Sequence, residues 1–403
     1  MKNESLETRA SRVMTPALSH TTNIEVERGR GAYLYSKDGK KYLDFACGIA
    51  VTNLGHCHPK VIASAVKQAE KLIHACAGIV YYDANVQLAE LLARICPAGL
   101  DMSFFCQSGT EAVEGAIKLA KYVKNKPGII AFQGGFHGRT LGSLSVTTSK
   151  QKYRDRYEPL LPDIFIAPYS KKDSLEIVEG FLKQKSIAGV IVEPIQGEGG
   201  YMVPSREFLY GLRSLCNKYE TFLIYDEVQT GFGRTGKMFA SQNFDVYPDI
   251  MALAKAIASG FPLGAVVAKS SIMKQWSPGA HGGTMSGNPV SCAAALATID
   301  IIEKEKLPEA AAKLGKYLTG RLETLKKSYK SVLDVRGLGL MIGVEFADGN
   351  TAKQVREHCL ANNLILITCG TNDQVIRFIP PLIVTKEQLD SALNIFEDAL
   401  KSI

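Results

Sequence analysis

The sequence predicts an α/β protein with a large domain, built on a mainly parallel sheet flanked by helices, and a small α+β domain formed by both ends of the chain. Two observations predict this. Between residues 102 and 267, short and nearly unbroken apolar runs alternate with helical segments, as expected for strands buried on both faces. On either side the pattern changes to a hairpin and to mixed helices and strands. We expect residues 1–57 and 289–403 to form the small domain and residues 58–288 the large one.

The elements follow in order along the chain. The segment GAYLYSKDGKKYLDFACG alternates apolar and polar residues around the turn formers Asp38 and Gly39, which predicts a hairpin. From Pro59 to about Ile95 the apolar residues recur at helical spacing. The strands of the large domain are expected at MSFFC, GIIAF, AGVIVEP, TFLIYDE, DIMALA and LGAVVA. After Asn288, helices are expected at SCAAALATIDIIEKE and AAAKLGKYLTGRLETLKK, followed by strands at GLMIGVEFA, LILITC and VIRFIPP.

Composition and charge argue against several classes of protein. The 47 basic and 40 acidic residues give a formal charge of +7 but are interspersed, so nucleic-acid binding is not expected. Nine cysteines without a C-x-x-C pair indicate free thiols in a reducing compartment. The polar N-terminus and the lack of an apolar stretch of about 18 residues predict a cytoplasmic protein without membrane contact. His56, Cys57 and His58 are adjacent and lack a second ligand pair, so no metal site is expected.

The run CQSGTEAVEGAIKLAKYV predicts an anion-binding site. Ser108, Gly109 and Thr110 stand between an expected strand and the start of an amphipathic helix. Backbone N–H groups at a helix N-terminus, together with two hydroxyls, can hold a phosphate. The alternative is an ordinary helix cap, with Ser108 or Thr110 as the capping residue.

Carboxylates follow two of the expected strands. GVIVEPIQGEGG carries Glu193 at the strand end and Glu198 in a glycine-rich loop, and TFLIYDEVQTGFGRTG carries Asp226. The carboxyl ends of strands in an open α/β sheet form the usual site edge. The G-x-G-x-x-G spacing in the second segment is a weaker alternative, a dinucleotide fingerprint, because aromatic residues and a proline follow it and the carboxylates precede it.

Lys255 ends the apolar run IMALA and precedes a turn rich in glycine and proline. Such a lysine either extends its amine to solvent or reacts covalently. Pyridoxal phosphate needs a lysine for its aldehyde, N–H and hydroxyl donors for its phosphate, and a carboxylate for its ring nitrogen. Lys255, the segment 108–110 and Asp226 supply these groups, which predicts a site for this cofactor.

Many ordered motifs then resemble one family. They are GIAVTNLGHCHPKV, SGTEAVEGAIKLA, FHGRTLGSLSVT, EPIQGEGG, DEVQTGFGRTG, KAIASGFPLG, GGTMSGNPVSCAAAL and DVRGLGLMIGVEF. Over nearly its whole length the chain resembles the class III aminotransferases of fold type I. The resemblance implies pyridoxal phosphate as cofactor, with Lys255 as covalent anchor and general base and Asp226 on the ring nitrogen. It also implies a homodimer, or a dimer of dimers, whose partner subunit lends Thr284 to the cofactor phosphate. The implied cofactor-binding residues are Ser108, Gly109, Thr110, Phe136, His137, Asp226, Val228, Gln229, Lys255 and Thr284.

The resemblance also implies how substrates are bound. Arg139 resembles the residue that binds the carboxylate far from the reacting amine, and Arg377 the one that binds an α-carboxylate. Glu198 would pair with Arg377 when the substrate has no α-carboxylate. Ile49 resembles the apolar residue found in 4-aminobutyrate aminotransferases where ornithine aminotransferases have tyrosine. Glu193 completes the expected substrate-binding set.

The expected reaction is transamination of an ω-amino acid, first of all 4-aminobutyrate to succinate semialdehyde, with 2-oxoglutarate as acceptor and glutamate as product. SGTEA, FHGRTLGSLS and RFIPPLIVT are equally similar to the acetylornithine aminotransferases, so an acetylornithine, ornithine or succinylornithine enzyme is the alternative. An epimerase or aminomutase of the same fold is a rival from another class. A cofactor-binding regulatory module is disfavoured because no DNA-binding segment is evident.

Overall fold

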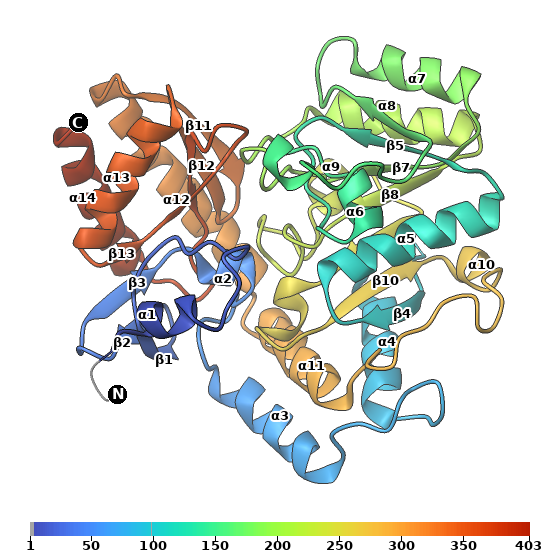
Figure 1. Ribbon diagram of the computed structural model, residues 1–403, viewed down its shortest axis with the longest axis horizontal. Coiled ribbons are helices and arrows are strands. Elements are labelled where there is room, and N and C mark those ends of the chain that lie inside the picture. Colours follow the sequence, from blue (N-terminus) through green and yellow to red (C-terminus); the bar gives the residue numbers. More distant parts are fainter. Residues whose placement is uncertain (1–3, 98) are drawn as a thin grey trace.

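The computed structural model describes residues 4–97 and 99–403, and its centre is a seven-stranded sheet with the order β4-β10-β9-β8-β7-β5-β6 (Figure 1). Only β10 runs antiparallel to its neighbours. The mainly parallel sheet predicted from the apolar runs is therefore confirmed. Its strands are β4 (Met102–Cys106), β5 (Gly128–Phe132), β6 (Ile164–Ala167), β7 (Ile187–Val192), β8 (Phe222–Asp226), β9 (Ile250–Leu253) and β10 (Gly264–Ala268).

Helices cover both faces of this sheet. Alternate residues of β5 point to opposite sides, as the twofold period of a strand requires. Ile130 and Phe132 pack in the core that includes α7 and α8, whereas Ile129 and Ala131 pack against α5. The helices and short helical turns of this part of the chain are α3 (Pro59–Lys71), α4 (Asp83–Ile95), α5 (Gly109–Lys124), α6 (Leu141–Ser145), η1 (Gln151–Tyr153), α7 (Ser174–Gln184), α8 (Arg206–Lys218), α9 (Ser241–Phe244), η2 (Lys255–Ala258) and α10 (Ser270–Met273).

The two ends of the chain meet in a second body with two four-stranded sheets, drawn in blue and red in Figure 1. The predicted hairpin is formed by β2 and β3, and β3 pairs in parallel with β13 from the C-terminal part through Leu43 and Leu364. The strands are β1 (Val26–Arg30), β2 (Tyr33–Ser36), β3 (Lys41–Asp44), β11 (Val332–Leu338), β12 (Met341–Phe346), β13 (Leu364–Ile365), β14 (Ile367–Cys369) and β15 (Val375–Phe378). The remaining helices are α1 (Leu6–Ser11), α2 (Cys47–Ala50), α11 (Pro289–Lys304), α12 (Leu307–Ser328), α13 (Gly349–Ala361) and α14 (Lys386–Lys401).

Local sequence explains where several helices begin. Asn288 accepts hydrogen bonds from the N–H groups of Val290 and Ser291, and Pro289 occupies the first turn of α11, where a missing N–H has no cost. Thr385 and Gln388 form a capping box at the start of α14. Helix α11 packs against α3 and α4, so its assignment to the C-terminal small domain remains a prediction. Among the described residues, no helix combines the length and the apolar character needed to cross a bilayer.

Candidate active site

Five parallel strand ends bring the predicted residues to one edge of the large sheet. Because β4 to β9 all run in the same direction, their carboxyl ends lie at the same edge. The residues that follow these ends include Ser108 after β4, Phe136 after β5, Glu193 after β7 and Lys255 after β9, while Asp226 ends β8. The sheet topology thus gathers chemical groups that are far apart in the sequence.

Asp226 is buried and held in a fixed orientation. Its Oδ2 lies 2.8 Å from Nδ1 of His137, and its Oδ1 accepts a hydrogen bond of 3.0 Å from the N–H of Val228. Burial alone would lower the pKa of His137, but the hydrogen bond to Asp226 and the charges of Asp226 and Glu193 outweigh it and raise that pKa. His137 therefore contacts the carboxylate, as a satisfied structural histidine does. Its predicted contact with a cofactor stays a prediction.

Glu193 links two loops of the site. Its Oε2 accepts the N–H of Phe136 at 3.0 Å and its Oε1 accepts the N–H of Gly197 at 2.9 Å. Burial, which outweighs the charge of His137, raises the pKa of Glu193 to about 7. Both carboxylate oxygens thus accept backbone N–H groups, so Glu193 stabilises the two loops that carry them. A direct contact with substrate, predicted for Glu193, stays a prediction.

Lys255 directly follows β9 and adopts a left-handed backbone with φ of 51°. No hydrogen bond or ion pair of its amine with another described residue is present. Burial lowers the pKa of Lys255 to about 8, opposed by the charge of Asp226 and assisted by that of Arg377. An amine with a pKa in this range is partly neutral near neutral pH, as a nucleophile or base requires.

The start of α5 packs closely against Val228 and Ala254, next to Asp226 and Lys255. A Cβ on Gly109 would lie 2.7 Å from Cγ1 of Val228 and 3.6 Å from Cβ of Ala254, so only glycine fits. The Ser108 hydroxyl accepts the N–H of Glu111 at 3.3 Å, which is the helix-cap alternative considered for it. Thr110 Oγ1 instead lies 2.8 Å from the hydroxyl of Thr140.

The predicted pair of Arg377 and Glu198 is present. Both side chains are largely buried, at 5% and 14% exposed, and Nη2 of Arg377 contacts Oε2 of Glu198. Arg377 also donates to the carbonyl of Thr368 from Nε at 3.1 Å and from Nη2 at 2.7 Å. Its Nη1 is buried without a partner among the described residues. Burial would lower the pKa of Arg377, but nearby Cys369 and Glu198 raise it, so the guanidinium remains a full cation.

Three residues that the sequence did not predict join this pair. Tyr153 donates its hydroxyl to Oε1 of Glu198 at 3.1 Å, and Lys150 Nζ lies 2.9 Å from the same oxygen. Asp373, in the turn between β14 and β15, contacts the Lys150 ammonium. Arg139 is exposed and lies over the Tyr153 ring, with 4.4 Å from Cζ to the ring centroid. The segment 150–153 carries two lysines and gave no sequence signal beyond that of a solvated charged stretch.

Two predicted residues stand apart within the chain. Thr284 is exposed, and its contribution to the site of a partner subunit stays a prediction. Ile49 is 49% exposed in the left-handed turn of α2 and stays a predicted wall residue.

Phe136 packs edge-on against Tyr153 at 5.8 Å between ring centroids. Gln229 lies against Gly197, and its Oε1 is buried without a hydrogen-bond partner among the described residues.

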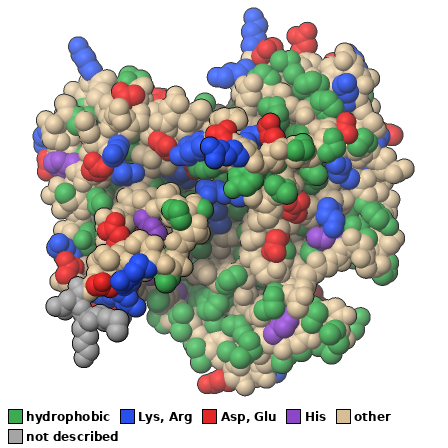
Figure 2. Space-filling view, in the orientation of Figure 1, with side chains coloured by type: hydrophobic (Ala, Val, Ile, Leu, Met, Phe, Trp, Pro, Cys, Tyr) green, Lys and Arg blue, Asp and Glu red, His purple; other side chains and the backbone are tan. Residues whose placement is uncertain are grey.

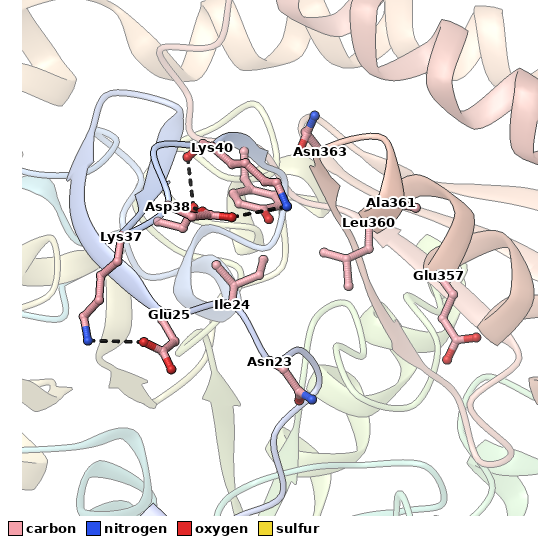
Figure 3. Close-up of a pocket in the computed structure, with 12 residues that line it drawn as sticks. Asn23, Ile24, Glu25, Lys37, Asp38, Lys40, Glu357, Leu360, Ala361 and Asn363 are labelled. Carbon is pink, nitrogen blue, oxygen red and sulfur yellow. Dashed lines mark hydrogen bonds and ion pairs between the residues drawn. The ribbon is translucent and has the colours of Figure 1, made fainter. Parts of the chain in front are cut away.

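One face of the molecule is hollowed, and a separate cavity lies elsewhere. Figure 2 shows a hollow between the two bodies of the protein, with Lys and Arg side chains gathered at its border. A separate cavity of about 730 Å³ lies beside α13 and the N-terminal strands (Figure 3). Four of its charged side chains pair with one another, Lys37 with Glu25 and Lys40 with Asp38, each at 3.2 Å, and Glu357 lies 3.7 Å from Arg356. None of the predicted site residues lines that cavity.

Comparisons with known proteins agree with the geometry. The profile of the family described as Aminotransferase class-III matches residues 14–400. The chain is 43% identical over 390 residues to an acetylornithine aminotransferase of Clostridium acetobutylicum, covering 94% of this chain and 97% of that protein. It is 35% identical over 402 residues to a probable 4-aminobutyrate aminotransferase of Bacillus subtilis, covering 93% and 92%.

Solved structures give the same result. A transaminase from the marine bacterium Virgibacillus superposes with a TM-score of 0.93 at 30% identity, covering 98% of both chains. The ornithine aminotransferase of Toxoplasma gondii, whose structure shows partial occupancy of PLP at the active site, superposes with a TM-score of 0.92 at 29% identity. That comparison covers 98% of this chain and 94% of the other.

Proposed function

The chain belongs to the class III aminotransferases, which depend on pyridoxal phosphate, and from this we propose that it transfers the terminal amino group of an ω-amino acid to 2-oxoglutarate. The observation that carries the proposal is the buried contact of Glu198 with Arg377 close to Lys255. A cation that can be either neutralised by the protein or offered to a substrate suits an enzyme with two kinds of substrate. One of them carries a carboxylate on the carbon that bears the reacting amine or keto group, and the other does not.

The residues at the strand edge fit the cofactor. Gln229 offers a buried oxygen without a partner, Gly109 leaves room only for backbone, and the Lys255 amine is free of ion pairs among the described residues. Lys255 would hold the cofactor covalently, Asp226 would keep its ring nitrogen protonated, and the N–H groups at the start of α5 would bind its phosphate. When bound, the cofactor supplies an electron sink for cleavage of the C–H bond beside the transferred amine.

The chain's own groups would carry the proton transfers and the orientation. The Lys255 amine, whose pKa burial lowers to about 8, would accept the proton from the amine-bearing carbon of the donor and return it during the transfer. His137 holds Asp226 by a hydrogen bond of 2.8 Å, and this contact would keep the carboxylate aimed at one position.

Two arginines would orient the substrates. Arg139, exposed above Tyr153, would bind the carboxylate at the end of the substrate away from the amine. Arg377 would bind the α-carboxylate of glutamate or 2-oxoglutarate after Glu198 leaves it. An ω-amino donor such as acetylornithine has no carboxylate on the carbon that bears the reacting amine. With such a donor Glu198 would stay on Arg377 and keep that cation paired.

Among the possible donors we propose acetylornithine. The supporting observation is that the relative with higher identity is an acetylornithine aminotransferase, whereas the probable 4-aminobutyrate aminotransferase is less similar. The comparisons therefore favour the alternative considered from the sequence over 4-aminobutyrate, the donor first expected. Ile49 is the feature that keeps 4-aminobutyrate as the second candidate, because an apolar wall suits a donor without an α-amino group.

A donor panel tests this proposal. Purified protein loaded with the cofactor is mixed with acetylornithine, 4-aminobutyrate, ornithine, 5-aminovalerate or β-alanine, and the visible absorbance of the cofactor is followed. Acetylornithine is expected to give the highest kcat/KM with 2-oxoglutarate as acceptor. A larger value for 4-aminobutyrate would favour the second candidate, and conversion of an amino acid without any keto acid would indicate an isomerase. Lys255→Ala should lose both the visible absorbance and turnover.

A further inference from the structure

Glu198 is held at its two carboxylate oxygens by different partners. Oε2 contacts Arg377 on β15, whereas Oε1 lies 2.9 Å from Lys150 Nζ and 3.1 Å from the Tyr153 hydroxyl. The Lys150 side chain is only 6% exposed. Lysine is almost never buried unless it is paired, so its position beside Glu198 calls for a functional or structural reason.

We propose that Lys150 is a positioning residue that holds Glu198 in place when Glu198 gives up Arg377 to a substrate α-carboxylate. This inference rests on the proposed function, in which Arg377 alternates between Glu198 and the substrate. Once released, Glu198 would be a largely buried anion, which is strongly disfavoured without a cation. The contacts of Oε1 with Lys150 and Tyr153 do not involve Arg377, so they can persist while Oε2 is freed.

The charges around Lys150 support this role. Asp373 contacts the Lys150 ammonium from the turn between β14 and β15. Burial alone would lower the pKa of Lys150, but Glu198 and Asp373 together raise it. Burial would likewise raise the pKa of Glu198, yet the charges of Arg377 and Lys150 lower it. Lysine and glutamate therefore both stay charged in the site, as an anion passed from one cation to another requires.

The proposal predicts a selective effect. With an ω-amino donor, Glu198 stays on Arg377, so losing Lys150 changes little. With glutamate, Glu198 has left Arg377 and depends on Lys150 and Tyr153. Replacing Lys150 should thus weaken the binding of glutamate and leave the binding of the ω-amino donor nearly unchanged. Replacing a residue that only stabilises the fold would affect the binding of both substrates alike.

The test compares Lys150→Met with a matched control. Lys152→Met removes the same charge two positions away; Lys152 is 64% exposed and lies 3.8 Å from Asp373, without a contact to Glu198. In the full-length, cofactor-loaded protein, each half-reaction is followed in a single turnover. For Lys150→Met the glutamate concentration giving half the maximal rate should rise by at least about tenfold, while that of the ω-amino donor stays within about twofold. Lys152→Met should leave both unchanged, and Lys150→Arg should restore most of the glutamate affinity.

A second measurement avoids turnover. Glutarate carries both carboxylates of glutamate but has no amine, so calorimetric titration of the loaded protein reports carboxylate binding alone. Its dissociation constant should rise with Lys150→Met as that for glutamate does. Equal losses for both donors, unchanged binding, or the same effect from Lys152→Met would overturn the positioning role. If Lys150→Met does not fold, Lys150→Gln decides by the same comparison. Failure of the wild type to convert any ω-amino donor refutes the proposed function instead, before any variant is compared.

Discussion

Replacing Glu198 by glutamine should separate the two substrate classes. The change keeps the shape of the side chain but removes the negative charge that meets Arg377, in a contact whose two side chains are 14% and 5% exposed. A hydrogen bond to a charged group contributes roughly 1.5–3 kcal/mol. An ω-amino donor has no carboxylate beside its reacting amine to replace it, so kcat/KM for this donor should fall by roughly 10- to 150-fold.

Glutamate should respond in the opposite direction. On the proposed function, its α-carboxylate displaces the Glu198 carboxylate from Arg377, and a neutral amide competes less well. The KM for glutamate should therefore stay the same or fall, by up to about tenfold. The guanidinium keeps its position in the variant because the Thr368 carbonyl still accepts from Nε and Nη2 at 3.1 and 2.7 Å.

The assay is a single-turnover measurement of each half-reaction through the cofactor absorbance. Glu220→Gln, a change of the same kind at an exposed position, serves as the control for loss of charge. Far-UV circular dichroism and Tm check that the variant is folded. Equal losses for the two donors, or a larger loss for glutamate, would show that Glu198 does not exchange with substrate on Arg377.

Three further outcomes follow from the site. Burial lowers the pKa of Lys255 from 10.5 to about 8, so below pH 8 the folded protein carries the full free-energy cost of a buried cation. Lys255→Met should therefore raise the Tm of the cofactor-free protein at pH 7 by roughly 2 °C or more. Calorimetry should find this gain in Tm lost above about pH 10.5, where the lysine is neutral in both the folded and the unfolded chain. Asp226→Asn should lower kcat by roughly 10²- to 10³-fold. It should also lower the pKa of His137, measured by NMR titration, because Asp226 helps to raise that pKa. An unchanged pKa of His137 would contradict the pairing of the two residues. Gly109→Ala should weaken cofactor retention on dialysis because the new Cβ would meet Val228 at 2.7 Å, and Val228→Ala in the same chain should recover part of it; no recovery would show that the clash is not the cause.

The strands buried on both faces were predictable from sequence because they are short apolar runs between helices. No strand was predicted at β6, Ile164–Ala167. It lies at the edge of the sheet, and three of its four residues are only partly buried. Its run Ile-Phe-Ile-Ala is apolar throughout but only four residues long, and a short apolar run does not by itself distinguish a strand from another buried segment.

The positions of Asp226 and Lys255 at the sheet edge were predictable because one ends an apolar strand and the other follows one. The site was not predictable where side chains meet across long stretches of chain. His137 and Asp226 are separated by 89 positions, and Tyr153 reaches Glu198 across 45. Neither a period nor a spacing records such contacts. Lys150 illustrates this. It lies in the charged segment SKQKYRDR, whose composition predicts a solvent-exposed lysine, but in the structure its side chain is buried against Glu198.

Arg377 lies on β15, outside the sheet that carries Lys255, while its counter-charge Glu198 follows β7 of that sheet. On the proposed function, the element that binds the acceptor's α-carboxylate and the element that holds Lys255 therefore belong to different sheets, which the ion pair joins. For enzyme engineering this means that widening the substrate range by loop exchange on the large sheet alone would alter only one member of that pair. Both members have to be redesigned together if the tolerance for two unlike substrates is to be kept.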